Sequence, residues 1–395
     1  MKNLFPTPHS LVLAVAAVFA APLAMAQNPS TNAKPEYTQP QASRLLLDLG
    51  PTINTPDGLG ISADGSLLIL SVPNFNNDHL IERKVITSPA APFMARISAD
   101  NQVSRWYDFT AADMHPDTGR IGPMDNAFGP DGNLYVADMQ VFFTKEHKSR
   151  ILRINVRDGQ ATGVDVVAEG FIAANGLAWE GDTLYLTDSV LVDPEKQAKG
   201  APFYSGVYAL PLSAMQSGTP IRVKPYDPNA AEDPRLVKAF TSSGRMGFGT
   251  DGIAFDDKGG LFVTNIEEAT IYKLTLDANR KATDMTVFAR DPKMHSADGM
   301  VFDAQRQRFY VADFNGNAVH AIDTSGRVTT LQKNGDTTGA NGELDQPAEV
   351  LIRGNELLVV NMDMAWATPG ISVNTEVDTD YNVAVIGLPP VPATN

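Results

Sequence analysis

Hydrophobic and polar positions follow one recurring pattern along the chain. A polar residue, usually followed by glycine, precedes a short apolar stretch, a turn, and an alternating strand that ends in Asp or Asn. In "DNAFGPDGNLYVADM", which starts at Asp125, the turn signal GPDGN leads into the strand-like LYVAD. Six segments share this pattern, and their key polar residues are Asp57, Asn126, Asn175, Asp251, Asp298 and Glu349.

This repeat predicts the fold. The key residues are spaced by about 69, 49, 76, 47 and 51 positions, close to the roughly 40–50 residues of a four-stranded propeller blade with two larger insertions. Further strand signals such as "RILRINV" follow, and long amphipathic helices are hard to find. We therefore predict an all-β, six-bladed β-propeller with four-stranded blades around a central metal-binding channel. The segment "ASRLLLDLG" is expected to supply a strand to the last blade and close the ring.

The first residues predict the cellular location of the protein. Lys2, the apolar run "LVLAVAAVFAAPLAMA" and an A-x-A site ending at Ala26 are typical of a signal peptide over 1–26. Residues 27–42 are polar and rich in Pro, Asn, Gln and Ser, which predicts a disordered leader before a propeller domain over 43–395. We expect a periplasmic or secreted protein with no membrane span, since later apolar runs are shorter than roughly 18–20 residues. A retained membrane anchor is the alternative.

Charge and cysteine content narrow the function classes. The chain carries 46 acidic and 31 basic residues, a formal net charge of −15, which argues against nucleic acid as a partner because phosphate binding needs clustered Lys and Arg. The chain has no Cys, so an exported protein must be held together by its core, its closure or a bound ion. We expect a monomer that acts on a small molecule.

The repeated polar residue predicts a metal site. In a propeller the innermost strand of each blade lines the channel, so a polar residue at the same point of every repeat falls on one ring. Carboxylate and amide oxygens suit Ca²⁺, whereas no His pair or thiolate cluster offers the ligands of Zn²⁺. Asp and Asn before Gly are also common in turns. Six in register, with amides in two blades and acids in four, favour a shared site.

The series of six repeated segments resembles the senescence marker protein/gluconolactonase (regucalcin-like) family of calcium-dependent six-bladed propellers over roughly residues 45–385. "AANGLAWEGDTLYLTDS" is similar to the family's N-G-L-x-W segment with its metal-binding Asn, here Asn175. The segments around Asn126 and Asp251 are similar to those that carry a channel Asn and a metal-binding, catalytic Asp. The family's first ligand is usually Glu, whereas this chain has Asp57, with Glu349 as a candidate replacement.

The resemblance implies an exported, calcium-dependent hydrolase, a lactonase or esterase. Its implied metal ligands are Asp57, Asn126, Asn175 and Asp251. Asp251 would activate water as a general base or attack as a nucleophile, and Asp298 would assist it. His295 is a further catalytic candidate. The chain has no G-x-S-x-G nucleophile elbow. A non-catalytic binding propeller, and a phosphotriesterase or lyase with the same ring, remain open because fold does not fix function.

Two further sets of residues carry expectations. Apolar side chains in the loops after the inner hairpins would either form a hydrophobic mouth for an aromatic or acyl substrate or pack the loops onto the propeller. They are Phe75, Phe142, Phe143, Phe203, Tyr204, Met362, Met364 and Trp366. The Asp or Asn that ends each second strand is expected to be structural. These residues are Asp138, Asp188, Asn265, Asp313 and Asn361.

Overall fold

The structure is a computed structural model that describes residues 42–364 and 370–391. The predicted signal peptide (1–26), and the predicted leader (27–42) except its last residue, lie outside the described residues. Within them, no helix has the length and apolar character needed to cross a membrane.

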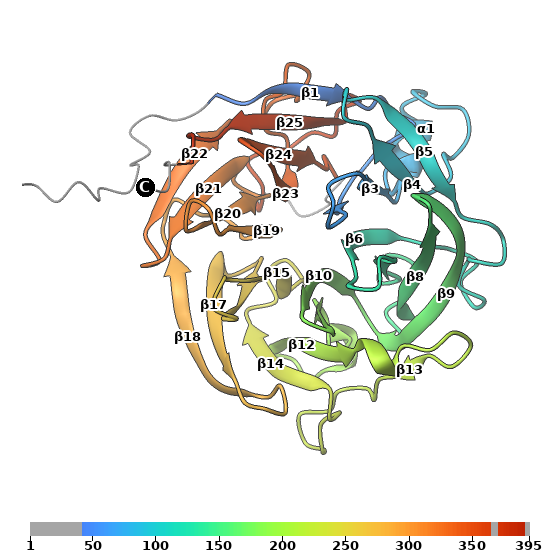
Figure 1. The fold of residues 1–395 in the computed structure, drawn as a ribbon, viewed down its shortest axis with the longest axis vertical. Coiled ribbons are helices and arrows are strands. Elements are labelled where there is room, and N and C mark those ends of the chain that lie inside the picture. Colours follow the sequence, from blue (N-terminus) through green and yellow to red (C-terminus); the bar gives the residue numbers. More distant parts are fainter. Residues whose placement is uncertain (1–41, 365–369, 392–395) are drawn as a thin grey trace, which may run out of the picture. The chain divides into compact units, whose positions relative to one another are not determined.

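Six β-sheets form the blades of a propeller, arranged in a ring (Figure 1). Blade 1 contains β2 (Leu59–Ile61), β3 (Leu68–Val72), β4 (Phe93–Ile97) and β5 (Val103–Asp108), and blade 2 contains β6 (Pro123–Phe128), β7 (Leu134–Asp138), β8 (Ser149–Arg157) and β9 (Gln160–Phe171). Blade 3 contains β10 (Ala174–Glu180), β11 (Thr183–Asp188), β12 (Phe203–Pro211) and β14 (Leu236–Ser242). Blade 4 contains β15 (Thr250–Phe255), β16 (Leu261–Asn265), β17 (Thr270–Leu276) and β18 (Ala282–Arg290), and blade 5 contains β19 (Met300–Asp303), β20 (Arg308–Asp313), β21 (Ala318–Asp323) and β22 (Val328–Lys333). The all-β, six-bladed prediction is confirmed.

Blade 6 closes the ring. It contains β23 (Pro347–Arg353), β24 (Glu356–Asn361) and β25 (Asn382–Gly387), and its outer strand is β1 (Arg44–Asp48) from the start of the domain. β1 pairs antiparallel with β25, from Arg44 opposite Val385 to Asp48 opposite Asn382. The predicted closure by "ASRLLLDLG" is confirmed. Closure of this kind ties the two ends of the propeller together without a disulfide.

Burial decreases from the middle of a blade to its rim. Every residue of the second strands β7, β11 and β20 is buried, although an alternating strand was expected. Both faces of these strands are covered by neighbouring blades, so polar residues are not needed on either face. On the outer strand β18 most side chains are exposed. Within the described residues the core therefore lies between the blades, in six apolar clusters rather than one.

Two insertions depart from the plain repeat. The connection between β12 and β14 forms the short strand β13 (Ile221–Arg222), which pairs parallel with β9 and gives blade 2 a fifth strand. This addition covers an otherwise open sheet edge. The connection between β3 and β4 forms the helix α1 (Asn77–Glu82), anchored by the buried Leu80. Short 3₁₀ turns follow β11 and β12, at η1 (Pro194–Lys196) and η2 (Leu212–Ala214).

The Asp or Asn at the end of each second strand is structural, as predicted. Asp138 accepts hydrogen bonds from the Gly122 amide and from two nitrogens of the buried Arg150. Asp313 accepts from the amides of His295 and Ser296. In both cases the carboxylate fixes the chain just before the innermost strand of the same blade, which is where the ring residues lie.

Candidate metal centre and pocket

A pocket opens where the innermost strands begin. It encloses about 410 Å³ of space free of protein atoms, counting its open mouth. Its polar lining consists of Asp57, Asn175, Asp251 and Asp298. The rest of the lining is apolar and consists of Met124, Met139, Phe142, Met246, Phe248, Ile266, Phe314, Met362 and Met364. The pocket is therefore an apolar well over a small group of oxygen atoms.

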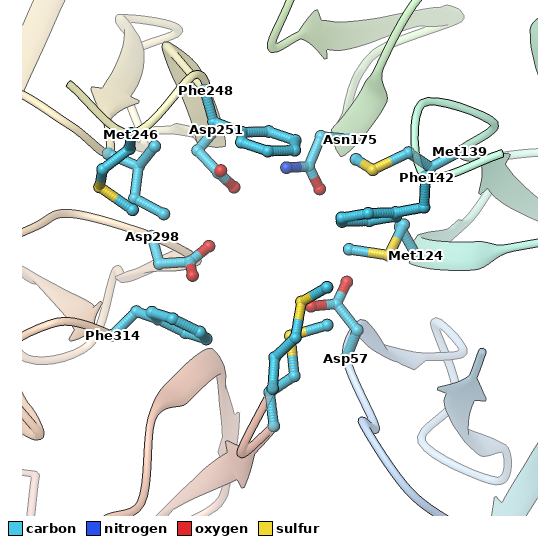
Figure 2. Close-up of a pocket in the computed structure, with 13 residues that line it drawn as sticks. Asp57, Met124, Met139, Phe142, Asn175, Met246, Phe248, Asp251, Asp298 and Phe314 are labelled. Atoms are coloured by element: carbon cyan, nitrogen blue, oxygen red, sulfur yellow. The ribbon is translucent and has the colours of Figure 1, made fainter. Parts of the chain in front are cut away.

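The four polar side chains converge from four blades. Figure 2 shows the carboxylates of Asp57, Asp251 and Asp298 and the amide of Asn175 directed at a common space. The Nδ2 of Asn175 donates to the Ser189 hydroxyl at 3.3 Å, so the amide is oriented with its oxygen toward that space. This arrangement brings together three of the four predicted metal ligands and the predicted catalytic assistant Asp298.

The hairpin pairing shows which residues occupy equivalent positions. Leu59, Leu177, Ile253 and Met300 pair with the centre of the second strand in blades 1, 3, 4 and 5. The ring residue stands two positions earlier in each case. In blade 2 the paired residue is Asn126, opposite Val136, and in blade 6 it is Val350, opposite Val359. The ring positions of blades 2 and 6 are therefore Met124 and Ala348.

The prediction that Asn126 is a ring ligand is wrong. Its Nδ2 donates to the Gly58 carbonyl at 3.0 Å and to the Ser71 hydroxyl at 2.9 Å, both in blade 1. Its Oδ1 is buried without a hydrogen-bond partner and lies against Gly60. Asn126 faces the far end of the innermost strands rather than the pocket. The cause is a register two residues away from the predicted one, which moves the side chain along the channel.

Two carboxylates lie one layer below the ring. Asp125 and Glu349 occupy the position that is glycine in the other four blades, and both line the opposite opening of the channel. A Cβ on Gly58 would lie 2.4 Å from the Asp125 Cα, and one on Gly299 would lie 2.6 Å from a Glu349 oxygen. The glycines thus leave room for the neighbouring blade's acid. Glu349 joins this lower layer, not the ring.

Burial, and next to it the neighbouring acids, destabilise the charged forms of the channel carboxylates. Burial is the main cause that raises the pKa of Asp57 and of Asp251 to about 7, and that of Asp125 to about 8. The pKa values of Asp298 and Glu349 are also well above the usual range, through burial and then through neighbouring acids. A hydrogen bond from Asp298 partly lowers the pKa of Asp251. Without a cation, some of these groups hold protons near neutral pH.

This donor set fits a divalent cation. No Lys, Arg or His is among the described residues that line the pocket or the opposite opening. Five acids without a cationic partner, together with an amide oxygen, are the hard oxygen ligands that Ca²⁺ prefers. Among the described residues, Asp57, Asp251 and Asp298 do not form a group of oxygens all within 4.8 Å of one another. A bound cation would need these side chains to draw inward or water to complete its shell.

The histidine prediction is also wrong. His295 is exposed, and its main chain is held in place: its amide donates to Asp313, and its carbonyl accepts from Arg245. His115, a second histidine near the site in sequence, is buried beside Arg150 and accepts from the Asp117 amide. Neither histidine lines the pocket.

The pocket wall contains only part of the predicted hydrophobic mouth. Phe142, Met362 and Met364 line it, while Phe75 lies behind Phe142 with ring centroids 4.6 Å apart. Phe143, Phe203 and Tyr204 do not line it, and Trp366 lies outside the described residues. The sequence reasoning missed the other side chains of the wall, which are Met124, Met139, Met246, Phe248, Ile266 and Phe314. Met139, Ile266 and Phe314 directly follow the second strand of a blade, just after the Asp or Asn with which the repeat ends that strand.

Comparisons with known proteins agree with the fold. No protein-family model matches the sequence, and none of the curated proteins does. Solved structures do match. A gluconolactonase from Xanthomonas campestris has a TM-score of 0.51 at 16% identity, over 92% of this chain and 99% of that one. A calcium-binding regucalcin from Agrobacterium tumefaciens has a TM-score of 0.50 at 14% identity, over 88% and 94%.

The chain has the propeller fold of gluconolactonase and regucalcin structures. The neighbours also include a PQQ-bound aldose sugar dehydrogenase from Streptomyces coelicolor, with a TM-score of 0.50 at 15% identity, over 88% of this chain and 99% of that one. Identities this low show the fold alone, and the same fold is used for different chemistry. The function must therefore be argued from the site.

Proposed function

We propose that the chain is a calcium-dependent hydrolase of lactones or esters whose acyl or aromatic part is apolar. The observation that carries the proposal is the convergence of Asp57, Asn175, Asp251 and Asp298 beneath a wall of Met and Phe side chains. Such a pocket suits a ligand with one polar end and one apolar body. The gluconolactonase among the structural neighbours supports the same reaction class.

Each polar residue has a proposed role. Asp57, Asn175 and Asp251 would hold Ca²⁺, which when bound would polarise the carbonyl and stabilise the developing oxyanion. Asp251 would take a proton from the attacking water, and direct attack by its carboxylate is the alternative. Asp298 hydrogen-bonds to Asp251 and would orient its carboxylate and share its proton. Met and Phe side chains would exclude water from the apolar part of the substrate.

Removal and return of the metal tests the proposal. Protein stripped with a chelator should lose hydrolysis of an aryl ester and lactone panel and regain it with Ca²⁺. Asp251→Asn should lose several orders of magnitude in kcat while keeping the fold. Asp284→Asn, the same chemical change on the exposed face of β18, is the matched control. Full activity without metal would contradict the proposal. Calcium binding with no turnover, phosphotriesters included, would favour a binding propeller.

Export is part of the proposal and rests on residues 1–26. Protein recovered from the periplasmic or external fraction should begin near Gln27 when its N-terminus is sequenced. A full-length chain retained in the cytoplasm would contradict export without affecting the catalytic proposal.

A further inference from the structure

Blade 6 carries a second group of acids that shares no residue with the channel ring. Asp345 precedes β23, Asp363 follows β24, and Asp378 lies in the connection from β24 to β25. One carboxylate oxygen from each lies within 4.8 Å of the other two. Because β23 and β24 are antiparallel, the start of one and the end of the other meet at one edge of the sheet.

The group contains buried oxygens that lack partners. Asp345 is 1% exposed, and neither of its carboxylate oxygens has a hydrogen-bond partner. The side-chain amide of Asn374 lies at the group, because its Nδ2 donates to Asp363 Oδ1 at 3.3 Å. Asn374 is 6% exposed, and its own Oδ1 has no partner. Buried oxygens of this kind are costly unless something binds them.

A neighbouring amide adds to this surplus of acceptors. Gln346 is 2% exposed, and its Oε1 is also unpartnered. Its Nε2 donates to the Ser372 hydroxyl at 3.3 Å, and the Nδ2 of Asn374 donates to the Glu376 carbonyl at 3.1 Å as well as to Asp363. The donors of both amide side chains are thus occupied by protein groups, while their oxygens are not.

The charge around the group is also unbalanced. Burial, followed by repulsion from Asp363, raises the pKa of Asp345 to about 9. Asp336 and Asp380 add further repulsion. Arg83 is the cationic side chain that lowers the pKa of Asp363. The single charge of Arg83 faces three clustered acids, so a divalent cation would balance the group.

We propose that Asp345, Asp363 and Asp378 bind a structural Ca²⁺ ion in blade 6, separate from the channel. The donor set consists of carboxylate oxygens, and two residues beside it carry buried, unpartnered side-chain oxygens: Asn374, whose Nδ2 contacts Asp363, and Gln346, which follows Asp345 in the chain. Oxygen-only sites with several carboxylates are typical of Ca²⁺. The proposal does not depend on the catalytic one.

The ion would brace one wall of the pocket. The carbonyl of Asp363 accepts from Asn76 Nδ2 at 2.6 Å, which ties the connection to blade 1. Met362 and Met364, on either side of Asp363, line the pocket. An ion held by Asp363 would therefore fix the part of the chain that carries both methionines, as well as the joint between the first and last blades.

Counting bound calcium tests the site. Equilibrium dialysis of the chelator-stripped full chain with ⁴⁵Ca²⁺ should give one ion fewer for Asp345→Asn than for the wild type. Its Ca²⁺-dependent rise in melting temperature should shrink as well. Asp380→Asn is the matched control, because Asp380 is an exposed acid of the same connection and the charge change is the same. This control should keep the wild-type ion count.

Further variants separate the outcomes. If Asp345→Asn does not fold, Asp378→Asn removes a less buried ligand of the same group and should lose the same ion. Asp251→Asn should affect only the channel ion. Wild-type stoichiometry in both blade 6 variants would overturn the site, and so would an equal loss in Asp380→Asn, which would indicate general electrostatics. Loss of an ion in Asp251→Asn alone would overturn this site but not the channel proposal.

Discussion

Replacing Asp125 by Asn tests the electrostatics of the channel directly. Asp125 occupies a glycine position of the repeat, one layer below the ring, and is repelled by Asp57 and Asp251. The substitution removes one negative charge and nearly preserves the shape of the side chain. In metal-free protein at pH 7–8 we expect Asp125→Asn to be more stable than the wild type.

The magnitude follows from two opposing effects. Burial and neighbouring acids raise the pKa of Asp125 from 3.8 to about 8, so at pH 7 this residue costs up to about 4 kcal/mol of folding stability. The Asp125 carboxylate also accepts from the Asn126 and Leu177 amides, each at 2.6 Å. An amide side chain keeps one of these bonds, and losing the other costs about 1–3 kcal/mol. The net gain expected at pH 7 is about 1–3 kcal/mol.

The sign of the effect should reverse with pH. Because the folded-state pKa is raised, the stability of the wild type is fully present below about pH 4 and falls as pH rises toward 8. Asp125→Asn should therefore be less stable than the wild type at pH 4–5 and more stable at pH 7–8. Urea denaturation in chelator across this range measures the difference, with Asp284→Asn as the control. A variant less stable by the same amount at every pH would refute the reasoning.

Three other predictions test separate parts of the site. Asn126→Ala loses the bonds to Gly58 and Ser71, so its free energy of unfolding should fall by about 1–3 kcal/mol; weaker calcium binding by calorimetry would return Asn126 to the ligand set. Phe142→Ala removes part of the pocket wall and should raise KM for an aryl ester by roughly tenfold, with little effect on a methyl ester; equal effects on both would contradict an apolar substrate site. Calcium affinity of the channel should fall as pH drops from 8 to 6, by up to about tenfold per pH unit for each carboxylate that takes up a proton; a flat profile would show that these acids are not ligands.

The sequence was enough to predict the blades. Each hairpin carries its own turn signal and a strand whose side chains are rich in β-branched and aromatic types, so local pattern and global fold agree. Closure by β1 was also predictable, because an apolar strand before the first repeat has no partner of its own. The ring residues of blades 1, 3, 4 and 5 were found because Asp or Asn precedes a glycine there.

The ring positions of blades 2 and 6 were not predictable from polar residues, because the residues there, Met124 and Ala348, are apolar. The polar residues that the pattern indicates there, Asn126 and Glu349, belong to other layers of the channel. The length of the hairpin does indicate the ring position of blade 2. The segments from Met124 to Val136 and from Asp251 to Val263 have the same length, and aligning them puts Met124 on the ring. The blade 6 acids had no such signal, because they come from connections whose lengths do not repeat.

The corrected register changes what the channel can do. Blades 3, 4 and 5 place Asn175, Asp251 and Asp298 side by side, whereas Asp57 stands between the apolar ring positions of blades 2 and 6. In blades 2 and 6 the acids, Asp125 and Glu349, lie one layer deeper in the channel. Oxygens therefore line one arc of the ring and the floor beneath it, and apolar side chains from blades 2 and 6, such as Met124 and Met362, line the pocket as well. With a cation held by Asp57, Asn175 and Asp251, the apolar side chains of blades 2 and 6 on either side of Asp57 would contact the body of a substrate.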